Sequence, residues 1–339
     1  MHIVITGGAG FVGARLARTL LEKKSLALAG AAATPIERLT LVDRAAPPAD
    51  LASDSRVNAV VGDLNDLLAN DAARAVPADA TLVFHLAAAV SGECEADFDL
   101  GMRSNLAATH ALLEACRRLG SQPTLVFASS LAVFGDSPEQ PLPPVIEDHT
   151  LPTPQTSYGI QKFIGEQLVA DYARKGFVRG RSVRLMTVCV RPGRPNAAAS
   201  SFFSGMIREP LAGVRAPCPV PDETLVALAS PARAIEGLLR AAEATDAQWG
   251  PRTAVNLPSL CVSVGDMAAA LGRVAGNAAT ELLDRTPDPV IRRIVKTWPG
   301  RVEAERARRL GLAPDASFEA IVRDYVRENP DAVKLPMAL

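Results

Sequence analysis

Residues 2–13 read HIVITGGAGFVG, a short apolar run that ends directly in a glycine-rich turn. The first five residues of this stretch are typical of a buried parallel strand. From residue 11 to about residue 24 the leucines fall at helical spacing, so the turn joins a strand to a helix. Gly7, Gly10 and Gly13 permit a tight turn and let backbone N–H groups approach a pyrophosphate. This order predicts a dinucleotide site, although glycine-rich turns also follow strands for purely steric reasons.

The alternation of short strands and helices continues to about residue 190 and then fades. Further strands are expected at residues 39–43, 57–61, 81–86, 125–128 and 184–190, and long helices at 98–120 and 157–175. Beyond the alternating part, helices are expected near 201–212, 231–244, 263–275, 287–297, 302–310 and 316–328, with one more strand at 253–257. An alternating half of this kind predicts an α/β fold with a doubly wound parallel sheet, of the Rossmann type and of about seven strands.

The remainder predicts a smaller, mostly helical C-terminal lobe. We expect residues 1–190, with about 231–258, to form the dinucleotide-binding domain. About 191–230 and 259–339 are expected to form the substrate-binding lobe.

Two acids stand where predicted strands end. Asp43 closes the second strand, where a carboxylate can accept hydrogen bonds from the adenosine ribose, although aspartate also often ends a strand at a simple turn. Its charge disfavours a 2′-phosphate and so favours NAD over NADP, a preference that neighbouring Arg44 could soften. Asp63 follows the third strand and could reach the adenine edge. The fourth strand ends in residues 87–89, three alanines small enough to let a cofactor lie against the backbone, and His85 is expected to be a packed strand-end residue.

Composition excludes several classes of partner. The 339 residues carry a formal net charge of −1, with no basic stripe, which argues against nucleic acid and against an anionic membrane surface. The five cysteines are scattered, without a Cys-x-x-Cys pair, so we expect a reducing compartment and no metal site. No apolar run is long enough for a membrane helix, and the chain is expected to be cytoplasmic.

A tyrosine and a lysine lie four residues apart in SYGIQK, residues 157–162. In a helix this spacing places Tyr158 and Lys162 on one face, and a nearby ammonium favours the phenolate form of a tyrosine. The pair is a candidate proton-transfer device; taken alone, it could equally be a chance pair on a surface helix. The fifth strand delivers Ser129 and Ser130 to the carboxyl edge of the sheet, where ligands bind in open α/β folds.

Together these residues resemble the extended short-chain dehydrogenase/reductase family over most of the chain. The resemblance lies in the glycine turn, in Asp63-Leu64, in residues 85–88, in the strand end SSLAVFG at 129–135, and in Tyr158-x-x-x-Lys162, which follows Ser130 by 28 residues. It implies that Tyr158 accepts the proton, that Lys162 lowers the pKa of the tyrosine and holds the nicotinamide ribose, and that Ser130 hydrogen-bonds the reacting oxygen. Asn105 would be the active-site asparagine.

The same resemblance implies an NAD site and a dimer. The residues in contact with NAD would be Gly7, Gly10, Phe11, Val12, Gly13, Asp43, Asp63, Leu64, Leu86, Ala87, Ala88, Tyr158, Lys162, Leu185 and Val188. The helices at 98–120 and 157–175 would pair across a twofold axis as a four-helix interface of a homodimer.

The substrate is narrowed by departures from the family pattern. Nucleotide-sugar dehydratases of this family place Asp-Glu directly after the catalytic hydroxyl, whereas Leu131 and Ala132 stand here, which argues against elimination from a sugar. Epimerases of the family often carry an asparagine after the sixth strand, where this chain has Thr187. Residues 225–231, LVALASP, replace a second stretch typical of those epimerases.

Two other stretches resemble a subgroup that oxidises the C2 hydroxyl of D-erythronate, a four-carbon sugar acid. They are AAVSGE at residues 88–93 and VRPGRPNAAASSF at residues 190–202. A small acid needs a cation, and Arg191 or Arg194 could supply it, unless both arginines are solvated or structural. The expected substrate contacts are Ser91, Ser130, Tyr158, Thr187, Arg191, Arg194 and Ser200.

Three functions follow from these patterns. The first is an NAD-dependent dehydrogenase that converts a small sugar acid into a 2-oxo acid. The second is a nucleotide-sugar epimerase that holds NAD tightly and returns the hydride, with no net change in cofactor. The third is a non-catalytic dinucleotide sensor, which the retention of both Tyr158 and Lys162 disfavours.

Overall fold

The structure, a computed structural model, describes residues 1–193 and 198–335. These residues form two compact units, which are described separately. Unit 1 comprises Met1–Ser130, Ser157–Arg184 and Ile235–Val255. Unit 2 comprises Leu131–Thr156, Leu185–Ala234 and Asn256–Leu339.

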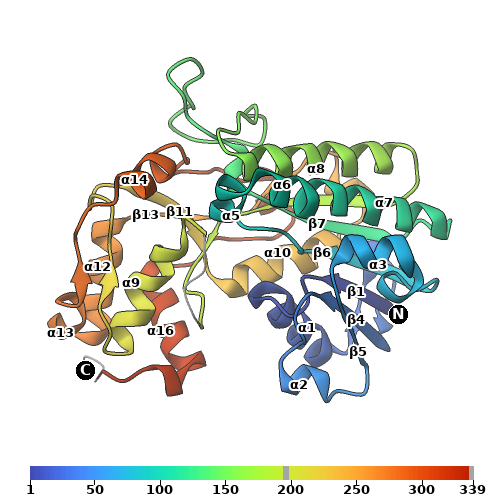
Figure 1. The fold of residues 1–339 in the computed structure, drawn as a ribbon, viewed down its shortest axis with the longest axis horizontal. Helices are drawn as coiled ribbons and strands as arrows, with labels where there is room; N and C mark the ends of the chain where they lie inside the picture. Colours follow the sequence, from blue (N-terminus) through green and yellow to red (C-terminus); the bar gives the residue numbers. More distant parts are fainter. Residues whose placement is uncertain (194–197, 336–339) are drawn as a thin grey trace. The chain divides into compact units, whose positions relative to one another are not determined.

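Unit 1 is built on a seven-stranded sheet with the order β12-β8-β7-β6-β1-β4-β5 (Figure 1). Its strands are β1 (His2–Thr6), β4 (Arg38–Asp43), β5 (Val57–Val61), β6 (Ala80–His85), β7 (Thr124–Ser130), β8 (Arg179–Leu185) and β12 (Val255–Asn256). The pairs from β5 through β4, β1 and β6 to β7 are all parallel. The chain winds outward from β1 to β5 and then returns to β6 on the other side, so the predicted doubly wound sheet is confirmed.

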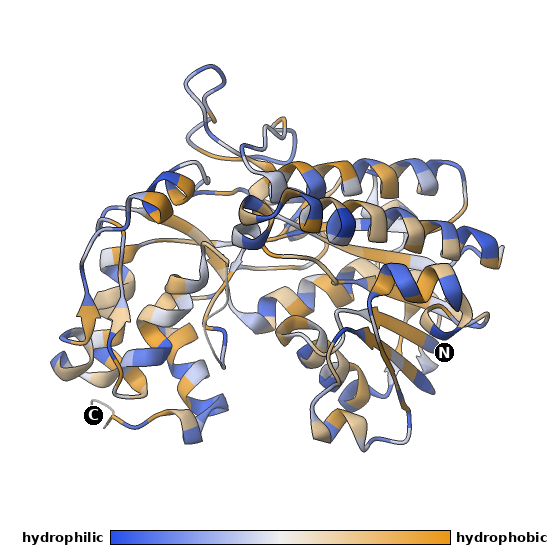
Figure 2. Cartoon of the chain, viewed as in Figure 1, coloured by the Kyte–Doolittle hydropathy of each residue, from blue (hydrophilic) through white to orange (hydrophobic). Residues whose placement is uncertain are grey.

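Helices cover both faces of this sheet. Figure 1 shows α3 (Leu64–Asn70), α7 (Ala108–Leu119) and α8 (Ser157–Arg174) on one face, and α1 (Phe11–Lys23) and α10 (Pro231–Glu243) on the other. Leu68, Leu112 and Val169 of the first three helices pack with Val4 and Phe127 of the sheet in one buried cluster. The central strands β1, β6 and β7 are largely apolar whereas the helices are striped (Figure 2), as expected for a sheet buried on both faces. Short helices complete the unit: α2 (Ala49–Ala52), α4 (Ala72–Ala75), α5 (Ser91–Ala96), α6 (Phe98–Gly101) and α11 (Asp246–Trp249).

Two local expectations for unit 1 need refinement or correction, and one small feature was not expected. Residues 25–35 form a small hairpin of β2 (Ser25–Leu26) and β3 (Thr34–Pro35) around the 3-10 turn η1 (Leu28–Gly30). The helix expected at 98–120 consists of α6, a π-helical segment η2 (Met102–Ala107) and α7, and it ends at Gly120 in the left-handed conformation. The strand expected at 184–190 has other bounds: β8 begins at Arg179 and ends at Leu185, and Thr187–Val188 form a separate short strand, β9.

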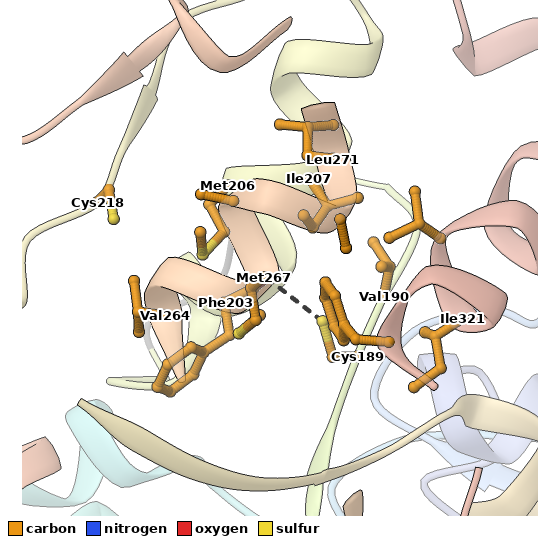
Figure 3. Packing of buried hydrophobic residues seen from close by; sticks show 14 of the residues in the cluster. Cys189, Val190, Phe203, Met206, Ile207, Cys218, Val264, Met267, Leu271 and Ile321 are labelled. Carbon is orange, nitrogen blue, oxygen red and sulfur yellow. Dashed lines mark hydrogen bonds between the residues drawn. The ribbon is translucent and has the colours of Figure 1, made fainter. Parts of the chain in front are cut away.

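Unit 2 is a helical layer around small sheets. Its helices are α9 (Ser201–Leu211), α12 (Val264–Ala275), α13 (Asn277–Thr280), α14 (Pro289–Lys296), α15 (Glu305–Arg309) and α16 (Phe318–Glu328), with 3-10 turns η3 (Leu131–Val133) and η4 (Pro330–Ala332). A three-stranded sheet has the order β13 (Leu260–Ser263), β11 (Leu225–Ala229), β9 (Thr187–Val188), and β10 (Ala216–Pro217) pairs with β14 (Leu283–Asp284). The sequence pattern missed β10, β11, β13 and β14, whereas β9 lies within the strand expected at 184–190. Figure 3 shows Phe203, Met206 and Ile207 of α9 in the core of the unit, with Met267, Leu271 and Ile321.

Candidate active site

The glycine turn between β1 and α1 has almost no room for side chains. Gly7 has φ +73°, and a Cβ on it would lie 2.8 Å from the backbone nitrogen of Ala87. A Cβ on Gly13 would lie 2.1 Å from the carbonyl oxygen of Gly7. Gly10 is the N-cap of α1 and has no side chain. It therefore offers no side-chain acceptor to the first N–H groups of the helix, which include those of Phe11 and Val12. A turn of this shape fits a pyrophosphate.

Asp43 is fixed beside this turn. One oxygen, Oδ2, accepts a hydrogen bond from the Ala9 N–H at 3.0 Å, and the other accepts one from the Ala45 N–H at 3.2 Å. The carboxylate is therefore oriented by the glycine turn itself and retains lone pairs for ribose hydroxyls.

Asp63 has a structural role at the start of α3. It is the N-cap of α3, where its Oδ1 accepts from the Asn65 N–H at 3.0 Å, and it pairs with Arg103 at 3.5 Å. Leu64 is the first residue of the helix and is nearly buried. Contacts of Asp63 and Leu64 with an adenine stay predictions.

His85 is the centre of a directional hydrogen-bond chain under the site. The hydroxyl of Thr109 donates its proton to the carbonyl of Asn105 at 2.6 Å, so Oγ1 must accept the hydrogen bond from Nε2 of His85 at 2.8 Å. Because Nε2 then carries the single proton of the neutral ring, Nδ1 of His85 accepts from Thr6 Oγ1 at 2.7 Å. Burial, with a smaller contribution from the charge of Lys162, lowers the pKa of His85 to about 3. His85 is therefore neutral, and it is packed at the end of its strand, as predicted. The predicted cofactor contacts Leu86, Ala87 and Ala88 follow directly, and the Leu86 N–H bonds Thr6 O at 3.1 Å.

Lys162 is buried at the base of α8, with 3% of its surface exposed. Its Nζ donates to the carbonyl of Ala128 on β7 at 2.8 Å. The same nitrogen lies 4.9 Å from the ring centroid of Phe127 and 5.7 Å from that of Tyr158. Burial lowers the pKa of Lys162 to about 8, against the opposing pull of Cys94 and Glu166. The lysine and the tyrosine thus share one face of α8, next to the strand that carries Ser130.

Asn105 lies in the π-helical segment and ties α8 to the end of β6. Its Nδ2 donates to Gln161 Oε1 at 2.9 Å and to the Ala89 carbonyl at 3.2 Å, and its Oδ1 accepts from the Ala89 N–H at 2.8 Å. Nδ2 also lies 3.2 Å from the sulfur of Cys94, whose pKa is raised, chiefly by burial. The side chain is thus committed to positioning the neighbouring backbone and α8.

A buried ion pair beneath the site was missed from the sequence. Glu166 receives Nε and Nη2 of Arg184 at 2.9 and 2.8 Å, and its Oε1 also accepts from Ser129 Oγ at 2.5 Å. Glu166 follows Lys162 by four residues on the same helix, a spacing that could have drawn attention to it. Because successive strand residues alternate in direction, Ser129 is committed to this pair and Ser130, which is partly exposed, turns to the opposite side.

The remaining predicted contacts, five with the substrate and two, Leu185 and Val188, with the cofactor, are divided between the two units. Ser91 is the first residue of α5 in unit 1 and is 8% exposed. Leu185, Thr187, Val188, Arg191 and Ser200 belong to unit 2, where Thr187 and Val188 form β9 and Ser200 is the N-cap of α9. Arg194 lies outside the described residues. The contacts of all these residues with cofactor or substrate stay predictions.

Two features are absent from the described residues. Residues 1–193 and 198–335 contain no group of three or more histidine, cysteine, aspartate or glutamate side chains placed to hold a metal ion. No helix in the same ranges has the length and apolar character needed to cross a membrane.

Comparisons with known proteins agree with this architecture. Residues 3–226 match the model of the NAD dependent epimerase/dehydratase family. A D-erythronate dehydrogenase of Cupriavidus necator is 51% identical over 97% of this chain and 98% of its own length. A D-erythronate dehydrogenase of Haemophilus influenzae is 40% identical over 96% of this chain and 99% of its own length.

Solved structures include a nucleoside-diphosphate-sugar epimerase from Agrobacterium tumefaciens. It is 42% identical and superposes with a TM-score of 0.88 over 98% of this chain and 95% of its own. The L-threonine 3-dehydrogenase of Trypanosoma brucei shares the fold, with a TM-score of 0.80 at 23% identity over 99% of each chain.

Proposed function

This chain belongs to the NAD-dependent epimerase/dehydratase family, and from that premise we propose that it oxidises the C2 hydroxyl of D-erythronate with NAD and releases a 2-oxo acid. The observation that carries the proposal is the 51% identity, over nearly the whole length of both chains, with the D-erythronate dehydrogenase of Cupriavidus necator. The geometry around Tyr158 and Lys162 supplies the chemistry that such a reaction needs.

The proton of the substrate hydroxyl passes to Tyr158. Lys162 lies 5.7 Å from the tyrosine ring and is protonated at neutral pH, so its charge favours the phenolate that accepts this proton. Ser130, at the end of β7, hydrogen-bonds the reacting oxygen and orients it. Bound NAD supplies the acceptor for the hydride that leaves C2.

The glycine turn and Asp43 would hold the cofactor. The backbone N–H groups at the start of α1 suit the pyrophosphate, and the space that a Cβ on Gly7 or Gly13 would fill must stay open for the turn to form. Asp43, oriented by the N–H of Ala9, would accept hydrogen bonds from the adenosine ribose and repel a 2′-phosphate. NAD is therefore preferred over NADP.

The carboxylate of D-erythronate requires a cation. Arg191 or Arg194 would supply it, since a guanidinium matches a carboxylate in two parallel hydrogen bonds. Ser91, Thr187 and Ser200 would contact the hydroxyl groups of the sugar acid.

The proposal is tested by following NAD reduction by the purified chain with four- to six-carbon sugar acids. D-Erythronate should give the highest kcat/KM of the panel, and D-threonate, its C2 epimer, is the matched control and should be turned over poorly. No reduction with any member of the panel would contradict the proposal.

A second candidate is a nucleotide-sugar epimerase, favoured by the likeness to the Agrobacterium tumefaciens protein that carries that description. An epimerase would bind a UDP- or dTDP-sugar tightly and invert it with no net change in NAD. Calorimetric titration with these nucleotide sugars should detect no binding if the dehydrogenase proposal is correct. Inversion of one of them would favour the epimerase.

We also propose that the chain forms a homodimer through α7 and α8. A groove of about 580 Å³ runs between η2, α7 and α8 and is lined by Met102, Leu106, Ile164 and Leu168 among others. Two further apolar side chains are exposed: Ile160 on α8, and Phe98 at the start of α6, the helix that precedes η2. The family resemblance implies a four-helix interface at these helices.

The five free cysteines suit a reducing compartment, and we propose the cytoplasm.

A further inference from the structure

Three groups of α9, one backbone carbonyl and two side chains, hold Cys189 and Arg191. The sulfur of Cys189 donates to the carbonyl of Phe203 at 3.3 Å, drawn as a dashed line in Figure 3. The backbone N–H of Arg191 donates to Ser204 Oγ at 3.0 Å, and the backbone carbonyl of Arg191 accepts from Nη1 of Arg208 at 2.7 Å. Both backbone hydrogen-bonding groups of Arg191 are therefore taken by side chains four residues apart on one helix.

The two side chains are themselves well fixed. Ser204 and Arg208 are 1% and 7% exposed, and the α9 residues between them, Met206 and Ile207, are fully buried in the core of unit 2 (Figure 3). Arg208 uses a second nitrogen, Nη2, to bind Glu209 Oε1, so its guanidinium is oriented in a plane by two partners. Lysine lacks this planar fork of donors.

We propose that Ser204 and Arg208 are positioning residues for substrate recognition: they fix the backbone of Arg191 so that its guanidinium is held in place for the carboxylate of the sugar acid. The proposal deepens the proposed function and rests on it. A cation on a loose loop loses both backbone and side-chain conformational entropy when it binds, whereas one whose backbone is held in advance by a packed helix loses only that of the side chain. The pair touches neither substrate nor cofactor in this account and acts only through Arg191.

The test is a set of double-mutant cycles on the full-length protein, read as initial rates of NAD reduction against D-erythronate concentration. Arg191→Met should raise the KM for D-erythronate about tenfold or more. Ser204→Ala and Arg208→Lys should each raise KM about three- to tenfold, with kcat within about twofold and the Kd for NAD unchanged. Arg215→Met, which removes an exposed arginine of the same unit, is the matched control and should change neither constant.

The decisive outcome is the behaviour in the Arg191→Met background. If Ser204 and Arg208 act through Arg191, Ser204→Ala and Arg208→Lys should add no further rise in KM once Arg191 is replaced. Fluorescence titration of the enzyme–NADH complex with D-erythronate should reproduce the pattern in a dissociation constant.

Two results would overturn the positioning role. In one, the KM effects multiply with that of Arg191→Met; in the other, variants that fold, as judged by thermal unfolding, keep the wild-type KM and lose only stability. Should Arg208→Lys fail to fold, Ser204→Ala alone decides between these results. A wild-type protein that does not oxidise D-erythronate would instead contradict the proposed function, and the positioning role with it.

Discussion

Lys162 combines a charge with almost complete burial. An ammonium loses much of its hydration in such a place, and its pKa falls to about 8 for that reason. The Ala128 carbonyl and the faces of the Phe127 and Tyr158 rings partly replace the lost water. The charge therefore persists at neutral pH beside Tyr158, which is what the proton transfer requires.

Tyr158→Phe tests this assignment at a single atom. Removing the phenol oxygen should lower kcat for D-erythronate by about 10²- to 10⁴-fold, because general base catalysis typically contributes that much. NAD affinity, measured by calorimetry, should stay within about twofold. Tyr172→Phe is the control on the same helix, since Tyr172 donates to Glu114 on α7 and lies two turns or more from Lys162. Equal activity of the two variants would contradict the role of Tyr158.

His85 gives the fold a specific sensitivity to acid. Its pKa is about 3 in the folded chain and about 6.5 when exposed, so between these values the unfolded state binds the additional proton. Stability should therefore fall as pH decreases below 6.5. From pH 7 to pH 4 this one residue should cost about 3 kcal/mol of unfolding free energy.

Denaturant unfolding of the wild type and of His85→Gln at the two pH values measures this contribution. The variant is less stable at pH 7 because it disturbs the chain of hydrogen bonds through Thr6 and Thr109, but it should lose less stability on acidification. Parallel losses in the two proteins would show that His85 does not titrate in this range.

Strand β8 shows where local patterns stop being informative. The apolar residues of 184–190 predicted a strand there, whereas the strand lies at Arg179–Leu185 and carries three arginines. Arg181 and Arg184 can be buried because Asp246 and Glu166, remote in sequence, neutralise them. Thr187 and Val188 then join β11 in a separate sheet. No property of residues 179–190 alone reveals these partners.

Elements that depend on neighbouring residues were predicted well. The turn after β1 needs glycine at Gly7, which has a positive φ, and at Gly13, where a Cβ would meet the carbonyl oxygen of Gly7, and both requirements are local to the motif. The spacing of Tyr158 and Lys162 on their helix can be read directly from the sequence. By contrast, the π-helical turn at Asn105 is stabilised by bonds to Ala89 and Gln161, which only the fold brings together. Strands β11 and β13 were missed because runs such as LVALA are short and rich in alanine.

The ion pair between α8 and β8 should behave as a unit. Glu166→Gln would leave the buried Arg184 charge uncompensated and should cost about 3 kcal/mol or more of unfolding free energy. Arg184→Met should cost a similar amount. The double variant should cost less than the sum of the two, by about 2 kcal/mol. Urea unfolding of the four proteins measures this coupling, and strictly additive losses would show that the pair contributes no mutual stabilisation.

At the scale of the whole molecule, the proposed dimer can be separated from the fold. Ile164 is 37% exposed and lines the groove beside α7. Ile164→Glu should convert a dimer into a monomer, because a charge would be buried in an apolar interface. Light scattering after size exclusion gives the mass. Val290→Glu, at a residue of unit 2 that is 53% exposed, is the control and should leave the dimer intact. A wild-type monomer would contradict the dimer directly.

The proposed function joins a generic site to a specific substrate. Tyr158, Lys162 and Ser130 are expected to catalyse the oxidation of a hydroxyl beside NAD. The arginine-containing segment after β9 is expected to determine the specificity for the sugar acid. Family membership is established over residues 3–226, whereas the identity of the hydroxyl group that is oxidised is a proposal.

Isotope transfer tests that proposal most directly. The purified chain is incubated with NAD and D-erythronate that carries deuterium at C2, and the reduced cofactor is analysed by mass spectrometry. Oxidation at C2 predicts one deuterium in the reduced cofactor per molecule of 2-oxo acid formed, with transfer abolished in Tyr158→Phe. Reduced cofactor without deuterium, or deuterium retained in the acid product, would contradict oxidation at C2.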